Sequence, residues 1–483
     1  MTIEREWETN SATKHRKLHI FCVHCGLCDL FRYLERMLLQ FSVSNFGSFR
    51  ELQTLNLAAS GQDKSLPENC IASDLPGLGG KRWVKGVAIY GANASGKSTL
   101  IRALNALASL VKTSAKVTDP KEPISVIEPF ALAADQAESP TAFAIALVAE
   151  GVRYEYRVAA TRERVWHESL RAFPEKREQI WYNRNWNPDQ SVYEWAPSRP
   201  TGFYRDPQLE GYTLPNMLFL SKAVASNRTD LEPVFRWFKD RLKFLDLSAR
   251  NPFGSGFTLK QIEEQTELCP GIVDLLRHAD LGVTDARVVE RRPVQEELDK
   301  MATSLPAELQ DGFRQRRWMR PELSHRGSGS TTVTLPWESE SAGTHRLFAL
   351  AGPWLDIMAK GYVVCIDELE TSMHPLMVRE LLRLMFGAKA NSGGAQILFT
   401  THNPLLLDAT LVRRDQVWFT DKTENGESHL YPLTDYAPRK GESLVRGYLS
   451  GRYGAVPFVP SGLMGGNLPH PEAIAHQEVA GHE

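Results

Sequence analysis

Residues Gly91 to Ser98 combine a Gly-rich turn with a lysine and a hydroxyl in the order G-x-x-x-x-G-K-S. In such a turn, backbone N–H groups converge on phosphate oxygens, Lys97 faces the β- and γ-phosphates, and Ser98 offers a hydroxyl to Mg²⁺. An apolar run precedes the turn and an amphipathic helical pattern follows it, so a phosphate site is favoured over a plain structural turn. The expected nucleotide contacts are Gly91, Ala92, Asn93, Ala94, Ser95, Gly96, Lys97, Ser98 and Thr99.

Two acidic residues follow the apolar run 362–366. With Ser98, Asp367 can hold Mg²⁺, while Glu368 is placed to orient or deprotonate an attacking water. Alone, the two acids could equally mark an ordinary strand end. Together with the phosphate loop they predict a metal ligand and a catalytic base.

Two further positions have polar groups at the expected edge of the sheet. His402 follows the apolar run 397–401, where its imidazole could contact the γ-phosphate or the water, although a capping or core histidine fits this position equally well. Ser341 and Gly343 begin a helical pattern, so their N–H groups and the helix dipole could form an anion site. Simple N-capping explains Ser341 equally well.

Strand and helix patterns around these residues predict an α/β fold. Alternation of strands and helices after residue 331 indicates a largely parallel sheet with ligands at its carboxyl edge. The stretch 37–49 predicts a half-buried strand with Leu39, Phe41 and Val43 inward, and 141–161 predicts two more strands, so an antiparallel sheet should flank the nucleotide core.

The spacing of the motifs predicts that the nucleotide domain is split. Lys97 and Asp367 lie about 270 residues apart, so a large insertion must separate them. Residues 161–205 interleave aromatics with arginines, which is typical of hairpin packing more than of a stacking platform for single-stranded nucleic acid. Helical patterns run from about 214 to 325, including one over 270–282 with Gly282 as its C-cap.

These patterns divide the chain into five segments. They are an N-terminal extension (1–36), the first half of the nucleotide domain (37–160), a hairpin plus a mainly helical insertion (161–330), the second half of the nucleotide domain (331–445) and a C-terminal tail (446–483).

The amino-acid composition indicates which partners and which cellular location are expected. An apolar fraction of 42% and a net charge of −2 fit a soluble protein and give no overall reason to bind nucleic acid or an anionic membrane. No apolar stretch is long enough for a membrane span, and scattered cysteines fit a cytoplasmic location. A nucleic-acid or acidic-partner contact would have to be local. The most basic cluster, for which a solvated helix face is the simpler interpretation, is Arg314, Arg316, Arg317, Trp318 and Arg320.

The N-terminal extension carries Cys22, Cys25 and Cys28 at C-x-x-C-x-x-C spacing. Three thiolates with His19 or His24 could ligate zinc or part of an iron–sulfur cluster. No second cysteine pair follows at the distance of a zinc finger, so an accessory segment is favoured, or one that is not natively translated, because Met37 begins a new and self-consistent pattern.

In combination, several stretches resemble the RloA-like AAA/ABC-type ATPases, relatives of the OLD, RecF and SMC proteins that are associated with bacterial phage defence and abortive infection. The matching stretches, from Met37 to about Phe458, are MLLQFSVSNFGSF, IYGANASGKSTLIRAL, ESAGTHRLFALAGP, CIDELETSMHP, ILFTTHNPLLLD and GYLSGRYGAVPF. Asn93 matches the asparagine that ABC-type loops carry. The resemblance implies a P-loop NTPase fold of ABC/SMC type, with ATP as substrate and Mg²⁺ as cofactor.

The resemblance also implies roles for the site residues. Ser341, Gly343 and Thr344 stand for the signature motif, which completes the ATP site of a second subunit in a head-to-tail dimer. Asp367 and Glu368 stand for the Walker B pair, and His402 for the switch histidine. Two departures are Gly47, where relatives often carry a basic residue, and the lack of a convincing Q-loop glutamine between 105 and 150.

The function expected from these features is an ATP-hydrolysing switch, homodimeric or larger, that controls a separately encoded effector in phage defence. The alternative is a RecF- or SMC-like ATPase acting on DNA, which would use the basic cluster near Arg316. A nucleic-acid-cleaving effector is disfavoured, because Asp367 and Glu368 are already committed to Mg·ATP. No acidic nuclease module follows His402.

Overall fold

The computed structural model describes most of the chain from Arg36 onward. The described residues are 36–73, 75, 78–175, 177–197, 202–246, 255–279, 282–290, 293–315, 317–439 and 441–456. The C-x-x-C-x-x-C motif, nearly all of the expected extension, Arg316 and the end of the expected C-terminal tail lie outside the described residues.

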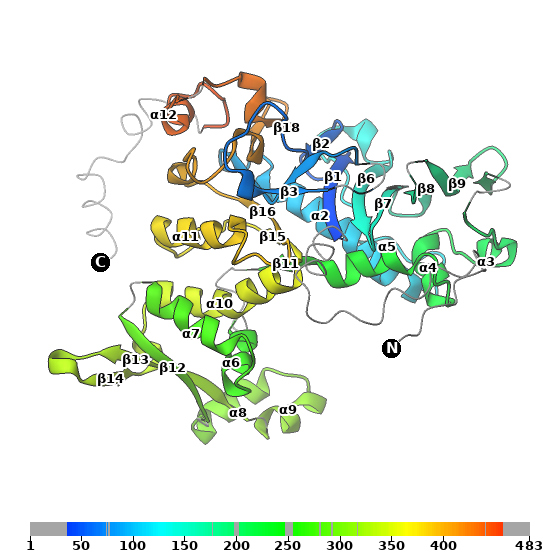
Figure 1. Cartoon of the computed structure of the whole chain (residues 1–483). Coiled ribbons are helices and arrows are strands. Elements are labelled where there is room, and N and C mark those ends of the chain that lie inside the picture. The colour runs from blue at the N-terminus through cyan, green and yellow to red at the C-terminus, as the bar shows by residue number, and fades with distance from the viewer. Residues whose placement is uncertain are drawn as a thin grey trace, which may run out of the picture.

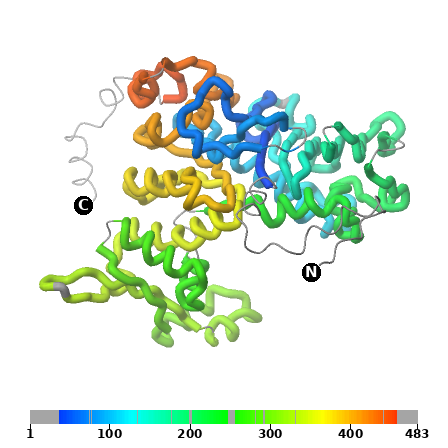
Figure 2. The backbone as a smooth tube through the Cα atoms, viewed as in Figure 1, coloured from blue at the N-terminus to red at the C-terminus, as the bar shows by residue number. Residues whose placement is uncertain are grey.

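A six-stranded sheet forms the centre of the molecule. Its order is β11 (Leu242–Leu245), β15 (Val363–Ile366), β16 (Gln396–Thr400), β5 (Gly86–Gly91), β17 (Val417–Lys422) and β18 (Ser428–Pro432). The first five strands are parallel and β18 is antiparallel. Figure 2 shows how this order places the blue N-terminal strand among orange C-terminal segments. The carboxyl ends of β5, β15 and β16, which precede the predicted site residues, therefore meet at one edge.

The two faces of this sheet pack against different partners. In β5, Val87 and Ile89 belong to one apolar core, and Ala88 and Tyr90 belong to the other. The first core includes the buried face of helix α2 (Lys97–Thr113), and the second includes α10 (Ala342–Lys360) and α11 (Pro375–Phe386). Both faces of the parallel strands are thus covered, which explains their uninterrupted apolar runs.

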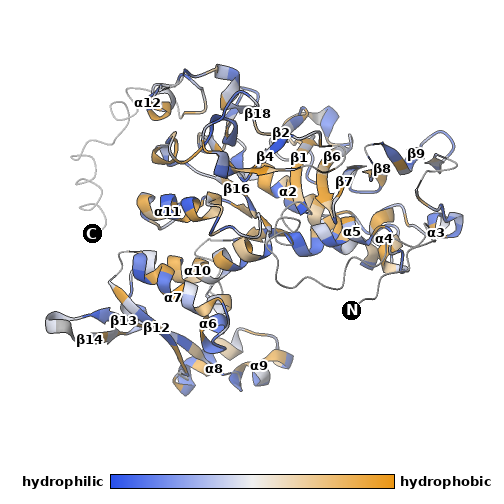
Figure 3. Cartoon of the chain, in the orientation of Figure 1, coloured by the Kyte–Doolittle hydropathy of each residue, from blue (hydrophilic) through white to orange (hydrophobic). Residues whose placement is uncertain are grey.

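A second, seven-stranded antiparallel sheet packs on the α2 side (Figure 1). Its order is β10 (Val192–Ala196), β9 (Gln179–Asn187), β8 (Val165–Phe173), β7 (Val152–Ala160), β6 (Thr141–Ala149), β1 (Arg36–Ser44) and β2 (Gln53–Asn56). The expected antiparallel sheet is confirmed. Strand β1 is more buried than expected, because Leu38 and Ser42 are buried as well as the predicted inward residues. Figure 3 shows β1 and β6 as hydrophobic strands.

One buried side chain joins the two sheets. The side-chain oxygen of Gln396, at the start of β16, accepts from the N–H of Leu38 at 2.7 Å. Its amide nitrogen donates to the carbonyls of Leu38 and Val84. Gln396 is fully buried, so each of these bonds satisfies a backbone group that water cannot reach.

The aromatic-rich segment 161–205 continues the antiparallel sheet. Trp181 and Tyr182 are buried, and the guanidinium groups of Arg164 and Arg184 lie over the rings of Trp186 and Tyr193. This confirms that the aromatics serve packing.

Helices and strands alternate in the rest of the insertion. Helices α3 (Pro207–Gly211), α4 (Phe219–Ala225) and α5 (Glu232–Arg236) precede β11. The following unit, here called the arm, contains α6 (Gly256–Glu263), α7 (Cys269–His278), β12 (Val283–Glu290), α8 (Gln295–Thr303), α9 (Ala307–Arg314), β13 (Met319–Arg326) and β14 (Thr332–Leu335). Figure 1 shows the arm beside α10.

Two helical expectations within this insertion were wrong. Residues 242–245, 283–290 and 319–326 are strands, because β11 completes the edge of the central sheet and β12, β13 and β14 pair in the arm. Helix α7 ends at His278 with Ala279 as its C-cap, whereas Gly282 has a φ of +69° and leads into β12.

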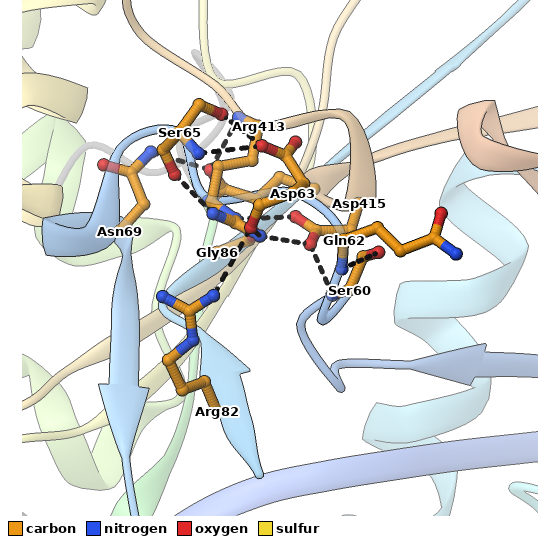
Figure 4. Close-up of polar contacts among 10 residues, drawn as sticks. Ser60, Gln62, Asp63, Ser65, Asn69, Arg82, Gly86, Arg413 and Asp415 are labelled. Atoms are coloured by element: carbon orange, nitrogen blue, oxygen red, sulfur yellow. Dashed lines mark hydrogen bonds and ion pairs between the residues drawn. The ribbon is translucent and has the colours of Figure 1, made fainter. Parts of the chain in front are cut away.

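The amino edge of the central sheet is held by a buried arginine (Figure 4). Arg413 donates to both carboxylate oxygens of Asp415 and to the carbonyls of Asp63 and Ser65. Asp415 also accepts from the N–H of Ser60. These contacts fasten the loop that leads to the hairpin of β3 (Cys70–Ala72) and β4 (Arg82–Val84), at the edge opposite the predicted site.

Candidate functional site

The phosphate loop lies between β5 and α2, as the sequence predicted. Gly96 has a φ of +109°, a conformation that glycine adopts without strain, and no side chain caps the first turn of α2. The Ser95 hydroxyl lies 2.6 Å from the hydroxyl of Thr420 in β17, which holds the loop against the sheet. The uncapped N–H groups at the start of α2 are therefore available to phosphate oxygens.

Lys97 is the charged group of this loop. Its ammonium donates to the carbonyls of Gly91 at 2.9 Å and Ala92 at 2.8 Å, and only 5% of the residue is exposed. Burial lowers the pKa of Lys97, while Asp367, Glu368 and Glu370 act in the opposite direction. The cation thus lies within the field of the acidic strand end, as a shared Mg·ATP site would require.

Thr400 is the last residue of β16, and its hydroxyl contacts both of the acidic residues that follow the neighbouring strand β15. Its hydroxyl donates to Asp367 Oδ1 at 2.6 Å and accepts from the N–H of Glu368 at 2.8 Å. Glu368 has a φ of +50°, an uncommon conformation for a residue with a side chain. The surrounding bonds hold it there, since its carbonyl accepts from the N–H and the hydroxyl of Thr371. Such held strain is typical of functional sites.

His402 lies beside Glu368 at the carboxyl edge. The distance from His402 Nε2 to Glu368 Oε1 is 3.8 Å, and both side chains are partly exposed. The backbone N–H of His402 donates to Glu370 Oε1, which fixes the turn after β16. The imidazole and the carboxylate therefore face a common space at the strand ends.

The site residues fit Mg²⁺ in their chemistry. Asp367 and Ser98 offer hard oxygen donors, and Mg²⁺ in nucleotide sites is bound by one or two protein oxygens with phosphates and waters. Among the described residues, no group of three or more His, Cys, Asp or Glu side chains could hold a metal on its own.

Ser341 caps helix α10. Its hydroxyl accepts from the N–H of Thr344 at 3.0 Å and lies 2.9 Å from the Thr344 hydroxyl. Ser341 is exposed and Gly343 is half-buried, and both line a cavity of about 920 Å³ between α7, α10 and α11. Within the described residues, no hydrogen bond joins Ser341 or Gly343 to the phosphate loop.

The structure thus brings together Lys97, Asp367, Glu368 and His402, whereas within the described residues no hydrogen bond joins Ser341, Gly343 or Thr344 to them. Thr400 and Glu370, which orient the acids and the histidine turn, were not among the predicted site residues. Thr400 follows Phe399, which pairs with Ile366, so its place beside Asp367 follows from the pairing of β15 and β16.

The structure shows why residue 47 is a glycine and not the basic residue that relatives often carry. Its φ is +57°, and a Cβ there would lie 2.8 Å from Thr99 Cγ2. The next residue, Ser48, contacts the Thr99 hydroxyl at 3.1 Å. A basic side chain at Gly47 would therefore collide with the first turn of α2.

The described arginines of the basic cluster are all paired with acids. Arg314 contacts Asp299 and Asp311, Arg317 contacts Glu263 and Glu290, and Arg320 contacts Glu338. Their charge is largely neutralised locally, which favours a solvated protein face over a phosphate-binding surface.

Comparison with protein families decides the classification. Residues 87–408 match the family described as "AAA domain, putative AbiEii toxin, Type IV TA system". The chain belongs to this family. The match runs from the strand before the phosphate loop to just beyond His402, so it covers the split AAA domain together with its insertion.

Solved structures give distant similarities to the AAA domain. A crystal structure of an SMC head bound to the C-winged helix domain of ScpA matches at 13% identity and a TM-score of 0.40, covering 82% of this chain and 96% of that chain. The SMC head domain from Thermotoga maritima matches at 13% identity and a TM-score of 0.35, covering 82% of this chain and 98% of that chain. No curated protein matches.

Together, the strand order and the family match identify the fold as an AAA domain built on a mixed, largely parallel sheet. In the described part of the AAA protein, no helix has the length and apolar character that crossing a membrane requires.

Proposed function

We propose that this protein is a cytoplasmic, Mg²⁺-dependent ATPase that works as a switch, with ATP sites completed by a second copy of the chain. The observation that carries the proposal is the separation of two half-sites. The phosphate loop, Asp367, Glu368 and His402 form one half, while the exposed N-cap of α10 forms the other and makes no hydrogen bond to the first within the described residues.

In the proposed reaction, the loop N–H groups and Lys97 bind the ATP phosphates. Ser98 and Asp367 would hold Mg²⁺, which would supply positive charge against the phosphate oxygens. Glu368, held by Thr400 and Thr371, accepts a proton from the attacking water, and His402 helps to orient that water. The N–H groups at Ser341 and Gly343 of the second copy contact the γ-phosphate. Loss of that phosphate loosens the interface.

ATP can drive such a switch only through its different affinity for the closed and open states. Each tenfold difference in affinity between the two states shifts the free-energy difference between them by about 1.4 kcal/mol. A composite site supplies this difference, because the signature turn of the second copy contacts ATP only when the dimer is closed.

Complementation tests the composite site. Lys97→Ala should abolish ATP binding, whereas Ser341→Arg should bind ATP as a monomer but fail to hydrolyse it. Each variant alone should be inactive. A mixture should regain activity, because a mixed dimer contains one site with an intact loop from the Ser341→Arg chain and an intact cap from the Lys97→Ala chain. An inactive mixture, or a fully active Ser341→Arg protein, would contradict the composite site.

We further propose that the switch controls a separately encoded effector in phage defence. The family description, which names a toxin–antitoxin system, supports this role. Plaque assays in the native host should show protection by the wild-type locus and loss of protection with Lys97→Ala. Equal plaquing with both alleles would contradict the defence role while leaving the ATPase intact.

The alternative, a DNA-dependent ATPase of RecF or SMC type, makes a different prediction. DNA should stimulate its turnover strongly, and the effect should fall with salt. The paired state of Arg314, Arg317 and Arg320 argues against such a surface.

A further inference from the structure

The segment between the arm and helix α10, residues 337–345, carries Ser341 at its centre; it is called the cap segment below. It follows strand β14 directly and runs into the first turn of α10. Side chains on both sides of Ser341 fasten the cap segment to its surroundings. These contacts belong neither to the phosphate loop nor to the acidic strand end.

A largely buried hydrogen bond between a histidine and a carboxylate holds the cap segment to the arm. His325 on β13 donates from Nε2 to Glu340 Oε1 at 2.7 Å, and the side chains are 15% and 5% exposed. The other close histidine–carboxylate pair within the arm, His278 with Asp274, is largely exposed. Glu340 immediately precedes the cap residue Ser341, so a buried charge-assisted bond fixes the backbone next to the cap.

A second set of contacts holds the other side of the cap. The rings of Trp337 and His345 lie 4.3 Å apart, and His345 Nε2 donates to the Trp337 carbonyl at 2.8 Å. Trp337 also meets Phe348, a buried residue of α10, edge to face at 5.1 Å. These contacts close the cap segment on itself and on α10, whereas two glutamates tie it to β13 of the arm: Glu340 through His325, and Glu338 through the more exposed Arg320.

We infer that His325 and Glu340 are a positioning pair through which the arm sets the place of Ser341 and Gly343 for hydrolysis. The inference rests on the proposed composite site. A partner that moves β13 relative to α10 would change turnover without touching ATP, since the cap segment follows His325. In this inference the arm regulates the signature turn through one contact, the His325–Glu340 pair. A partner protein bound to the arm would act on that pair.

The test compares variants that break the pair with one that keeps its hydrogen bond. His325→Ala and Glu340→Ala remove it, and His325→Gln retains a donor near the position of Nε2. Arg287→Gln is the matched control, because it breaks the Arg287–Glu322 pair on the same arm sheet, and no hydrogen bond or ion pair joins Arg287 to the cap segment within the described residues. Turnover at fixed protein concentration, ATP affinity of the monomer and thermal unfolding are measured for each full-length variant.

Breaking the pair should lower turnover by about tenfold, the size expected for a lost charge-assisted bond, with monomer ATP affinity unchanged. His325→Gln should recover most of the rate, and Arg287→Gln should match the wild type. The double variant should be no slower than either single variant, because both remove one interaction. If Glu340→Ala unfolds, the contrast between His325→Ala and His325→Gln decides the matter.

Two failures are distinguishable. If Ser341→Arg abolishes turnover while His325→Ala and Glu340→Ala leave it unchanged, the positioning pair is refuted and the composite site stands. If Ser341→Arg itself has no effect, the composite site is wrong. An equal loss of turnover in His325→Ala and His325→Gln would also refute the inference, because the rate would then not depend on the hydrogen bond to Glu340.

Discussion

Thr400 shows how a neutral side chain can organise a charged site. One hydroxyl both donates to Asp367 and accepts from the Glu368 backbone, so the expected metal ligand and the expected base share one anchor. Thr400 is fully buried, and the loss of its hydroxyl cannot be compensated by water. The geometry of Asp367 and Glu368 thus depends on a residue in the next strand of the sheet.

Thr400→Val should therefore lower turnover by at least about tenfold and destabilise the fold by about 1–3 kcal/mol, because Asp367 and the Glu368 N–H lose their partner. ATP affinity should change little, since the phosphate loop is intact. Steady-state ATPase rates and urea unfolding measure both effects. Thr400→Ser keeps the hydroxyl and should stay close to wild type; a Thr400→Val enzyme with the wild-type rate would show that this anchor is dispensable.

Gly47 is a second residue whose backbone matters for the site. Gly47→Ala should cost at least about 1–2 kcal/mol, because its φ of +57° disfavours a side chain and the new Cβ would meet Thr99. Nucleotide affinity should fall as well, since Thr99 lies in the first turn of α2. Gly61→Ala is the matched control, with no atom within 4 Å of the new Cβ. Equal stability of the two variants would contradict this explanation.

At the scale of elements, the sequence predicted most strands of the central sheet, but not its outer strand β11, nor β12 and β13 of the arm. The runs 363–366 and 396–400 are buried on both faces, so each reads as an unbroken apolar stretch that ends at a polar site residue. Strands β12 and β13 carry charged residues and few buried ones, and their pairing depends on partners that are distant in sequence. Local patterns therefore could not separate them from helices.

The same limit applies to the candidate site. The phosphate loop, the acids and the histidine were found because each follows a recognisable strand, and the structure places them together. The positive φ of Glu368 and the roles of Thr400 and Glu370 arise from contacts between strands, which no local pattern contains. The bridge from His325 to Glu340 likewise depends on the pairing of the arm strands.

Substitution of Arg413 tests whether its buried contacts hold the loop at the amino edge of the central sheet. Arg413→Ala should cost about 3–5 kcal/mol, because Asp415 would remain buried without its cation and the carbonyls of Asp63 and Ser65 would lose a donor. The ATP affinity of the folded protein should be unchanged, because this network lies opposite the phosphate loop. Arg236→Ala, which breaks an exposed pair with Glu232, should cost less than about 1 kcal/mol in urea unfolding.

A small loss in Arg413→Ala, similar to that in Arg236→Ala, would show that the buried network contributes little. Weaker ATP binding by the folded Arg413→Ala protein would instead show that the two edges of the sheet are coupled.

At the scale of the whole molecule, one AAA domain is assembled from two distant parts of the chain. Strand β5 from the first part lies between β16 and β17 from the second, and the insertion supplies the outer strand β11 and the arm. The arm leaves the domain after β11 and returns directly into the cap segment. The cap segment, which carries Ser341, therefore lies at the point where the arm rejoins the domain.

The central claim is that ATP closes two copies of this chain over composite sites. The most direct measurement is the mass in solution of Glu368→Gln with Mg·ATP, determined by light scattering, because this variant should bind ATP without hydrolysing it. The proposal predicts a shift to twice the mass of one chain with Mg·ATP, and no shift with ADP or when Ser341→Arg is added to the same chain. A protein that binds Mg·ATP and keeps the mass of one chain would contradict it.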